Sequence, residues 1–237
     1  MELIVLNHTE YKEKDAIVNA ICEEGEYTFL ARGILDPKSK NIILSSPLVI
    51  ADIETMDGNY KHPILKASKL LMSPYGMNDS LEKLASISLV EEASRVLLQE
   101  EEKSLLFPEL KKAVMVFKDN SVNPLTVALI YLANVLKNVG YEFEVNKCVY
   151  CGSKQNIAAF SFSDGGFICK DCMDEYTPSD LTPSQMRVVR AIFLLKEYKD
   201  IPDTSDHDLL VVLHGLIDFI KDGLGITLKS YSLLNFQ

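Results

Sequence analysis

Residues 1–78 alternate short apolar runs with turn-forming residues, a pattern typical of β-strands. The runs lie at 3–6, 16–22, 27–32, 41–44, 48–53 and 64–68. The segment 23–26 places a glycine between the second and third runs, which indicates a hairpin. About five short strands in a segment of this length predict a small closed or half-closed β-barrel.

From Asp79 onward, apolar positions recur every three or four residues, as on one face of an α-helix. Capping signals and apolar stripes then predict five helices. The first starts at Ser80, the second covers 106–117, and the third runs from Asn123-Pro124 to Gly140. The fourth starts at the capping box Thr182–Gln185, and the fifth covers 208–222 and stops at Gly223. The tail 226–236 is expected to be extended. The fold class is therefore α+β, with a barrel domain at 1–78 and an all-α domain at 79–237.

The totals agree with a folded chain of one or two domains. The chain has 237 residues, 47% of them hydrophobic, and a net charge of −10. No apolar run approaches the ~20 residues of a membrane span. The start of the chain lacks the basic segment of a secretory signal, so we expect a cytoplasmic protein with reduced thiols and no membrane partner. The acidic balance argues against nucleic-acid binding by the whole surface but permits a local basic patch.

Four of the five cysteines form two matched pairs, Cys148-x-x-Cys151 and Cys169-x-x-Cys172, with seventeen residues between them. Two such turns bring four thiolates around one tetrahedral ion, and this ligand set suits zinc. Four thiolates leave no open position for water or substrate, so the site is structural. Two disulfides or a CxxC redox centre remain as alternatives. We expect a zinc module at about 146–177, inserted between two helices of the α domain.

Motifs for enzymatic chemistry are missing from the sequence, and the four histidines are scattered. There is no P-loop, GxSxG, HExxH or Gly-rich dinucleotide turn, so a non-enzymatic protein is expected. The segment 31–40 carries Arg32, Lys38 and Lys40 around a bend at Gly33. Such a loop beside a barrel strand is suited to follow a phosphate backbone, although a solvated hairpin loop is the simpler interpretation.

In the order of its motifs, the chain resembles the RecO family of bacterial recombination mediators along nearly its whole length. The matching motifs are the Glu-Glu-Gly hairpin at 23–25, Ala-Arg-Gly at 31–33, the Lys-Ser-Lys loop at 38–40, Asn123-Pro124, Val-Gly-Tyr at 139–141, both cysteine pairs, Phe160-Ser161, Gly165-Gly166 and the ending 223–234.

The resemblance implies an N-terminal OB-fold, a helical C-terminal domain and a zinc module. It further implies binding of single- and double-stranded DNA, annealing of complementary strands, and partnership with RecR and single-stranded DNA-binding protein when RecA is loaded onto DNA. The loop after Gly33 is less basic than the family pattern and contains Asp36. DNA binding is therefore expected to depend on low salt or on a partner protein.

These arguments give a specific set of candidate residues. The expected DNA contacts are Arg32, Lys38 and Lys40, followed by Lys66 and Lys69. Arg187 and Arg190 lie three apart on the helix expected at 183–198, where they would pair with the acidic tail of single-stranded DNA-binding protein. Ordinary exposed arginines are the alternative there. For the whole protein, the alternatives are a zinc-stabilised interaction adaptor that does not bind DNA and a thiol–disulfide enzyme.

Overall fold

The structure, a computed structural model, describes residues 1–57, 61–98, 100–174, 181–195, 198 and 204–234. The chain forms two compact units, Met1–Asn120 and Ser121–Gln237. The strands of the first unit end at Met72 and its first helix begins at Leu81, where the sequence pattern changes. Two helices that follow the barrel belong to the first unit, so a boundary at 78/79 stays a prediction.

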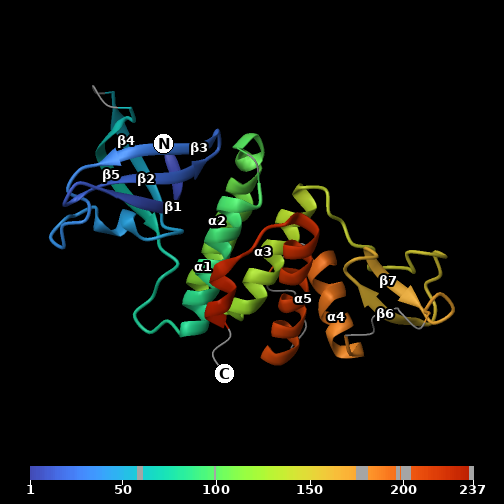
Figure 1. Cartoon of the computed structure of the whole chain (residues 1–237). Coiled ribbons are helices and arrows are strands. Elements are labelled where there is room, and N and C mark those ends of the chain that lie inside the picture. Colours follow the sequence, from blue (N-terminus) through green and yellow to red (C-terminus); the bar gives the residue numbers. More distant parts are fainter. Residues whose placement is uncertain (58–60, 99, 175–180, 196–197, 199–203, 235–237) are drawn as a thin grey trace. The chain divides into compact units, whose positions relative to one another are not determined.

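Five strands close into a barrel in the first unit (Figure 1). They are β1 (Glu2–Tyr11), β2 (Asp15–Cys22), β3 (Gly25–Ala31), β4 (Ile50–Met56) and β5 (Ile64–Met72), in the order β1-β2-β3-β5-β4. Strands β1 and β4 pair to complete the closure, and only β3 and β5 pair in parallel. This is the small OB-like barrel that the sequence predicts.

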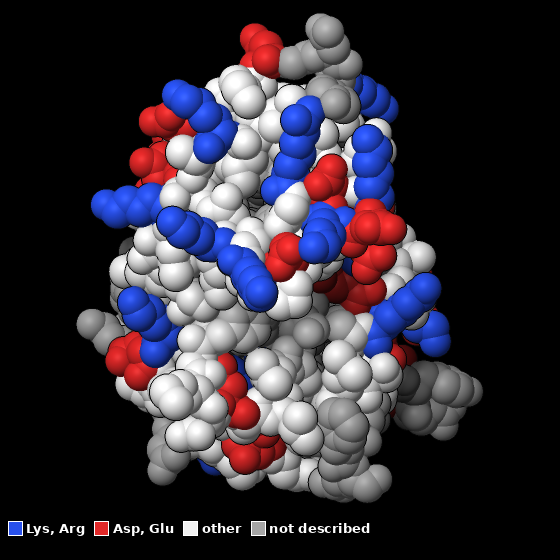
Figure 2. Space-filling view, turned by 90° about the vertical axis from the view of Figure 1, so that its left-hand side faces the viewer, with Lys and Arg blue, Asp and Glu red and all other residues white. Residues whose placement is uncertain are grey.

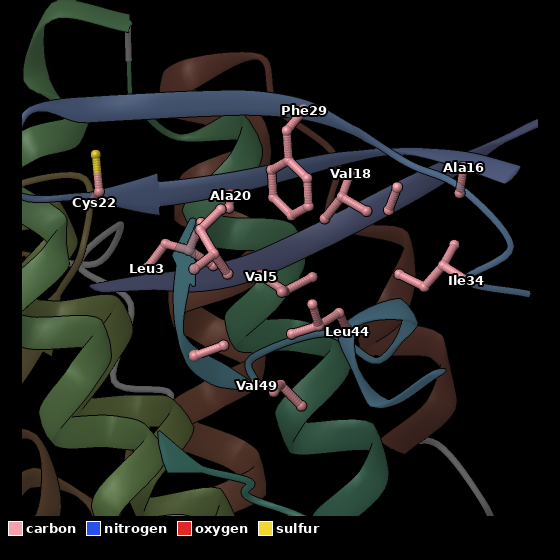
Figure 3. Close-up of a cluster of buried hydrophobic side chains, with 13 residues drawn as sticks. Leu3, Val5, Ala16, Val18, Ala20, Cys22, Phe29, Ile34, Leu44 and Val49 are labelled. Carbon is pink, nitrogen blue, oxygen red and sulfur yellow. The ribbon is translucent and has the colours of Figure 1, made fainter. Parts of the chain in front are cut away.

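Alternate residues of the strands point into the barrel and form its core (Figure 3). Ala16, Val18, Ala20 and Cys22 of β2 all face inward, as the period of two requires. Phe29 lies among them with no exposed surface. Cys22, the fifth cysteine of the chain, thus acts as a small buried hydrophobic residue of this core.

The prediction of a strand at 41–44 is wrong. Ile42–Ser45 form a short 3₁₀ helix, η1, closed by hydrogen bonds such as Leu44 N–H to Asn41 O at 2.9 Å. Leu44 is fully buried in the barrel core. A single helical turn therefore buries this apolar side chain without pairing with another strand.

Helices α1 (Leu81–Val96) and α2 (Leu106–Asp119), joined by the 3₁₀ helix η2 (Glu100–Leu105), pack against β1. Ser80 caps α1 as predicted, its side chain accepting from the Lys83 N–H at 3.1 Å. The Lys83 amine also pairs with Asp79 at 2.8 Å, and both side chains are nearly buried. The first unit thus combines the barrel with a helical layer.

The second unit contains α3 (Pro124–Asn138), α4 (Pro183–Leu194) and α5 (Asp206–Leu224), which pack pairwise. Asn123 caps α3, and the capping box of α4 is present as predicted. The helix expected to reach residue 198 ends at Leu194, and residues 196 and 197 lie outside the described residues.

The end of α5 differs from the prediction. Gly223 lies inside the helix, and Gly225 ends it with φ of +70°, a conformation that glycine adopts without steric cost. Residues Lys229–Leu234 form a 3₁₀ helix, η4, so the expected extended tail is wrong over this segment, and 235–236 lie outside the described residues.

A hairpin of β6 (Ile157–Ser161) and β7 (Gly166–Cys169) is inserted between α3 and α4 together with the cysteine pairs. The helices on either side of the insertion, α3 and α4, contact each other. Residues 175–177 of the expected module lie outside the described residues. Within the part of the chain that the structure describes, no helix is long and apolar enough to cross a membrane.

Candidate metal centre and nucleic-acid interface

The four paired cysteines converge on one point. The sulfur atoms of Cys148, Cys151, Cys169 and Cys172 all lie within 4.8 Å of one another. Cys151 and Cys169 sulfurs are 3.6 Å apart, and none of the cysteines forms a disulfide. Thiolates around a tetrahedral zinc at about 2.3 Å would be about 3.8 Å apart. The donor set and its spacing therefore fit one metal ion.

Backbone hydrogen bonds fix the first cysteine turn. The Gly152 N–H donates to Cys148 O at 2.9 Å, and the Cys148 N–H donates to Ser153 O at 2.8 Å. The Val149 N–H donates to Phe167 O at 2.8 Å, which ties this turn to β7. Because β7 ends at Cys169, the same strand positions the second pair. The ligands are thus held by the backbone of the hairpin.

Gly166 allows the closest backbone approach in the module. Its φ is +154°, and a Cβ there would lie 2.3 Å from the Glu144 carbonyl oxygen. The Phe167 N–H donates to that same oxygen at 2.9 Å. A side chain at 166 would therefore push apart the segment leading to Cys148 and the strand leading to Cys169.

The thiols differ in how readily they ionise. Burial opposes ionisation of Cys148, but backbone N–H groups of Cys151, Cys169 and Tyr150 lower its pKa to about 6. Hydrogen bonding with the Cys151 and Cys169 thiols, together with burial, raises the pKa of Cys172 to about 12. A divalent cation at the centre would favour the thiolate form of all four ligands.

An aromatic cluster anchors the cysteine hairpin to the helices of the second unit. Phe143, which precedes the module, lies 4.9 Å from Phe193 of α4 and 5.0 Å from Phe219 of α5, measured between ring centroids. Phe162, which follows β6, lies 5.5 Å from Phe143 in an edge-to-face arrangement. Such pairs add to the energy of burial. The module is therefore packed onto the helices as well as closed by its cysteines.

The basic residues predicted to contact DNA lie on the barrel surface. Arg32, Lys38 and Lys40 are all exposed and follow β3 in the connection to β4. Asp36 does not neutralise this loop, because its carboxylate pairs with the Lys14 amine at 2.6 Å. That hydrogen bond, with another from the Lys38 backbone N–H, holds the pKa of Asp36 below its usual range.

Lys66 and Lys69 lie on β5, where acidic neighbours offset them. The Lys66 amine pairs with Glu54 at 3.1 Å, and Lys69 lies opposite Asp52 in the β4–β5 register. The Ser68 hydroxyl donates to the Asn41 side chain at 2.8 Å, so the loop after Lys40 contacts the strand that carries Lys69. The structure thus brings the two predicted groups of lysines onto adjoining segments.

The β1–β2 turn adds basic residues that the sequence analysis did not select. Lys12 and Lys14 lie in this turn and are exposed. The Leu35 N–H donates to Lys14 O at 3.0 Å, which brings the turn next to the connection carrying Arg32 and Lys38. The signal in the sequence is Tyr11-Lys-Glu-Lys14, an aromatic residue beside two lysines. Figure 2, a view from the left-hand side of Figure 1, shows Lys and Arg side chains interspersed with acidic ones on the face that it presents.

Arg187 and Arg190 are both exposed on α4. Val188 and Ile192, which form an apolar stripe beside them on α4, are 5% and 2% exposed. The stripe is therefore part of the packed interior of the second unit, with the arginines at its margin. Their binding of a partner stays a prediction.

Known proteins match this chain along nearly all its length. The sequence model described as recombination protein O N terminal matches residues 1–62, and that described as recombination protein O C terminal matches residues 78–198. The chain is 25% identical over 241 residues to the DNA repair protein RecO of Thermoanaerobacter sp. strain X514, covering 99% of this chain and 96% of the relative.

Two further relatives carry the same printed name. The DNA repair protein RecO of Bacillus subtilis strain 168 is 26% identical over 176 residues, which are 73% of this chain and 68% of the relative. The DNA repair protein RecO of Syntrophomonas wolfei is 27% identical over 170 residues, which are 71% of this chain and 68% of the relative. This chain, which combines a small barrel, a helical unit and a four-cysteine site, therefore belongs to the recombination protein O (RecO) family.

Proposed function

We propose that this protein is a non-enzymatic mediator of DNA repair and recombination. It binds single- and double-stranded DNA, anneals complementary strands and helps load a recombinase onto DNA coated with single-stranded DNA-binding protein. The observation that carries this proposal is membership of the RecO family together with exposed basic side chains on an OB-like barrel. It acts at the nucleoid in the cytoplasm.

The mechanism is electrostatic. Arg32, Lys38 and Lys40 contact phosphates from the β3–β4 connection, with Lys66 and Lys69 contributing less because acidic residues lie beside them. Each phosphate contact releases counterions, which is why affinity falls as salt rises. Since phosphates carry no sequence information, the barrel holds complementary strands near each other whatever their sequence. The net charge of −10 keeps the affinity modest.

The metal is zinc, and its role is structural. Cys148, Cys151, Cys169 and Cys172 would hold it, and four thiolates leave no position for substrate. Zinc would supply binding energy that stabilises the fold of the module. Through the aromatic cluster, the folded module packs against α4 and α5 and stabilises their positions.

The helical unit recruits partners. Arg187 and Arg190 pair with carboxylates of the acidic tail of single-stranded DNA-binding protein, because both are exposed on one face of α4. RecR is the second partner, as the family resemblance implies. Together these contacts bring the coated strand to the barrel, where annealing or recombinase loading takes place.

One experiment on one purified sample tests the proposal. Annealing of complementary oligonucleotides and binding to labelled single-stranded and duplex DNA are measured from low to physiological salt, with metal content determined in parallel. We expect faster annealing than for DNA alone, affinity that falls steeply with salt, and about one zinc per chain. A folded, zinc-loaded protein that neither binds nor anneals DNA at low salt would instead be an interaction adaptor.

A further inference from the structure

The outer face of β1, β2 and β3 changes character along the strands. At one end, Ile4 and Ile21 lie opposite each other and are fully buried, on the side where α1 and α2 pack against β1. Next comes a polar row in which the Asn19 amide donates to Asn7 at 2.7 Å and the Thr28 hydroxyl donates to Asn19 at 3.0 Å. Beyond that row, the outward-facing residues are apolar again, although an uncovered barrel face is expected to be polar.

Ile17 and Leu30 form this second apolar pair. They lie opposite each other in the β2–β3 register, and they alternate with the inward-facing Ala16, Val18 and Phe29, so they belong to the outer face. Of the described helical elements, η2 packs most closely on β2 and β3, and its Lys103 pairs with Glu26, near the opposite end of β3 from Leu30. An outward apolar pair on a strand face indicates a binding surface when it is set in a concavity.

A pocket of about 270 Å³ lies above this pair. It is lined by Tyr11, Ile17, Leu30, Lys61 and His62. The Leu30 N–H donates to Pro63 O at 2.8 Å, which holds the segment carrying Lys61 and His62 against β3. We call this the barrel pocket. Its walls come from the end of β1 and from the β4–β5 connection, and its floor from β2 and β3.

The lining has the chemistry of a stacking site. Tyr11 is 37% exposed, and the Lys12 amine lies 5.3 Å from its ring centroid. His62 supplies a second ring and Lys61 a second cation. The flat face of a nucleic-acid base packs against aromatic rings and aliphatic side chains. Neighbouring cations contact the phosphates of the nucleic-acid backbone. The volume lies just below the ~300–1,000 Å³ of pockets for drug-sized ligands, so it suits one planar ring system.

The charged residues around the barrel pocket differ in what they contact. Asp15, opposite Tyr11 in the β1–β2 register, accepts a hydrogen bond from the Gly33 N–H at 2.8 Å. Its carboxylate is therefore engaged with the strand connection. Lys14 is paired with Asp36, whereas Lys12 stacks over Tyr11.

We propose that the barrel pocket binds one unpaired base of single-stranded DNA. The base contacts the rings of Tyr11 and His62 and the floor of Ile17 and Leu30, and Lys12 and Lys61 contact the adjoining phosphates. Bases inside a duplex are stacked and paired, so only a single strand can place one there. The inference rests on the proposed DNA binding and adds to it a contact that distinguishes single strands from duplexes.

The test compares the full-length wild type with Tyr11→Ala, Tyr11→Phe and Ile42→Ala, the last a matched control at another exposed apolar residue of the barrel. Each is titrated with an oligo-dT, an abasic oligonucleotide of equal length and a duplex. Stacking of one base is worth about 1–3 kcal/mol, so Tyr11→Ala should weaken oligo-dT binding about 5- to 150-fold. Tyr11→Phe and Ile42→Ala should bind like the wild type.

Binding of the abasic strand and of the duplex should be unchanged in Tyr11→Ala, and so should the salt slope, because no charge is removed. An equal loss on the abasic strand, or no loss on oligo-dT, overturns the inference while leaving DNA binding intact. A wild type that binds none of the three ligands rejects the proposed function and the inference together.

A second measurement needs no variant and covers the case in which Tyr11→Ala does not fold. Single-stranded DNA containing 5-iodouracil is photocrosslinked to the wild-type protein, and the attached peptides are identified by mass spectrometry. Crosslinks to Tyr11 or His62 support the inference. Crosslinks confined to other peptides overturn it.

Discussion

At the scale of single residues, the effect of the Asp36 charge depends on its ion pair with Lys14. In the sequence Asp36 stands between Arg32 and Lys38, where it lowers the net positive charge of the loop. In the structure its carboxylate is bound by Lys14, from the β1–β2 turn, and by the Lys38 backbone N–H. The Asp36 carboxylate therefore offsets the charge of Lys14 and not the side-chain charge of Lys38 or Lys40.

The first prediction concerns these two lysines. Lys38→Glu/Lys40→Glu should weaken binding to all DNA sequences alike and lower the slope of log K against log salt by roughly one to two units, because phosphate contacts are lost. Fluorescence anisotropy over a salt series measures both quantities. Lys118→Glu/Lys221→Glu, which changes the net charge equally at exposed helix positions, is the control. An unchanged slope would place the DNA contacts elsewhere.

The second prediction concerns Gly166. Gly166→Ala should destabilise the protein by about 1–3 kcal/mol, because the new Cβ meets the Glu144 carbonyl and the backbone there has positive φ. Thermal denaturation of zinc-loaded protein measures the change. Gly76→Ala is the matched control, since the Cβ there approaches only a side-chain oxygen, at 3.1 Å. Equal melting temperatures for the two variants would contradict the prediction.

At the scale of elements, α4 has a buried apolar side and an exposed basic side. Its apolar residues Val188, Val189 and Ile192 are buried, while Arg187 and Arg190 remain exposed. The capping box of Thr182 and Gln185 fixes where α4 begins and hence which way the arginines face.

The third prediction concerns this helix. Arg187→Glu/Arg190→Glu should weaken binding of a peptide with the acidic, aromatic-ended tail of single-stranded DNA-binding protein at least tenfold, because attraction to carboxylates becomes repulsion. A peptide titration by calorimetry gives the affinity, after zinc content and helicity have been checked. If the folded variant binds the peptide as the wild type does, this face of α4 is not the receptor, and the mediator proposal survives.

At the scale of the whole molecule, the two compact units depend on different sources of stability. The barrel unit rests on a continuous apolar core that includes Phe29 and Leu44. The second unit contains the cysteine hairpin, whose two short strands bury little by themselves, pack against the aromatic cluster, and carry four cysteines that could hold a metal ion.

The fourth prediction follows from this difference. Removing zinc with a chelator, or by Cys151→Ser or Cys169→Ser, should speed hydrogen exchange in residues 143–172 and in α4, and should lower soluble yield, because metal binding contributes folding energy. Backbone amides of β1, β2 and β3 should keep their protection. Hydrogen exchange read by mass spectrometry separates the two regions. A metal-free protein with unchanged exchange in 143–172 would show that the site is dispensable.

Local signals in the sequence determined much of this protein. The period of two in β2, the caps at Ser80, Asn123 and Thr182, and the spacing of the cysteines act over a few residues, so they can be read directly. The barrel, the helices and the four-cysteine site were predicted on this basis. The run at 41–44 was misread because an apolar run of that length suits either a strand or a single buried turn.

Only the tertiary structure decided which distant residues act together. The pairing of Lys14 with Asp36 and the contact between Asn41 and Ser68 join segments 22 and 27 residues apart. The barrel pocket brings Tyr11 next to His62, whereas Ile17 and Leu30 look like ordinary strand residues in the sequence. Barrel closure determines these contacts, because the register of each strand against its neighbours sets which side chains share a face, and no local pattern encodes that register by itself.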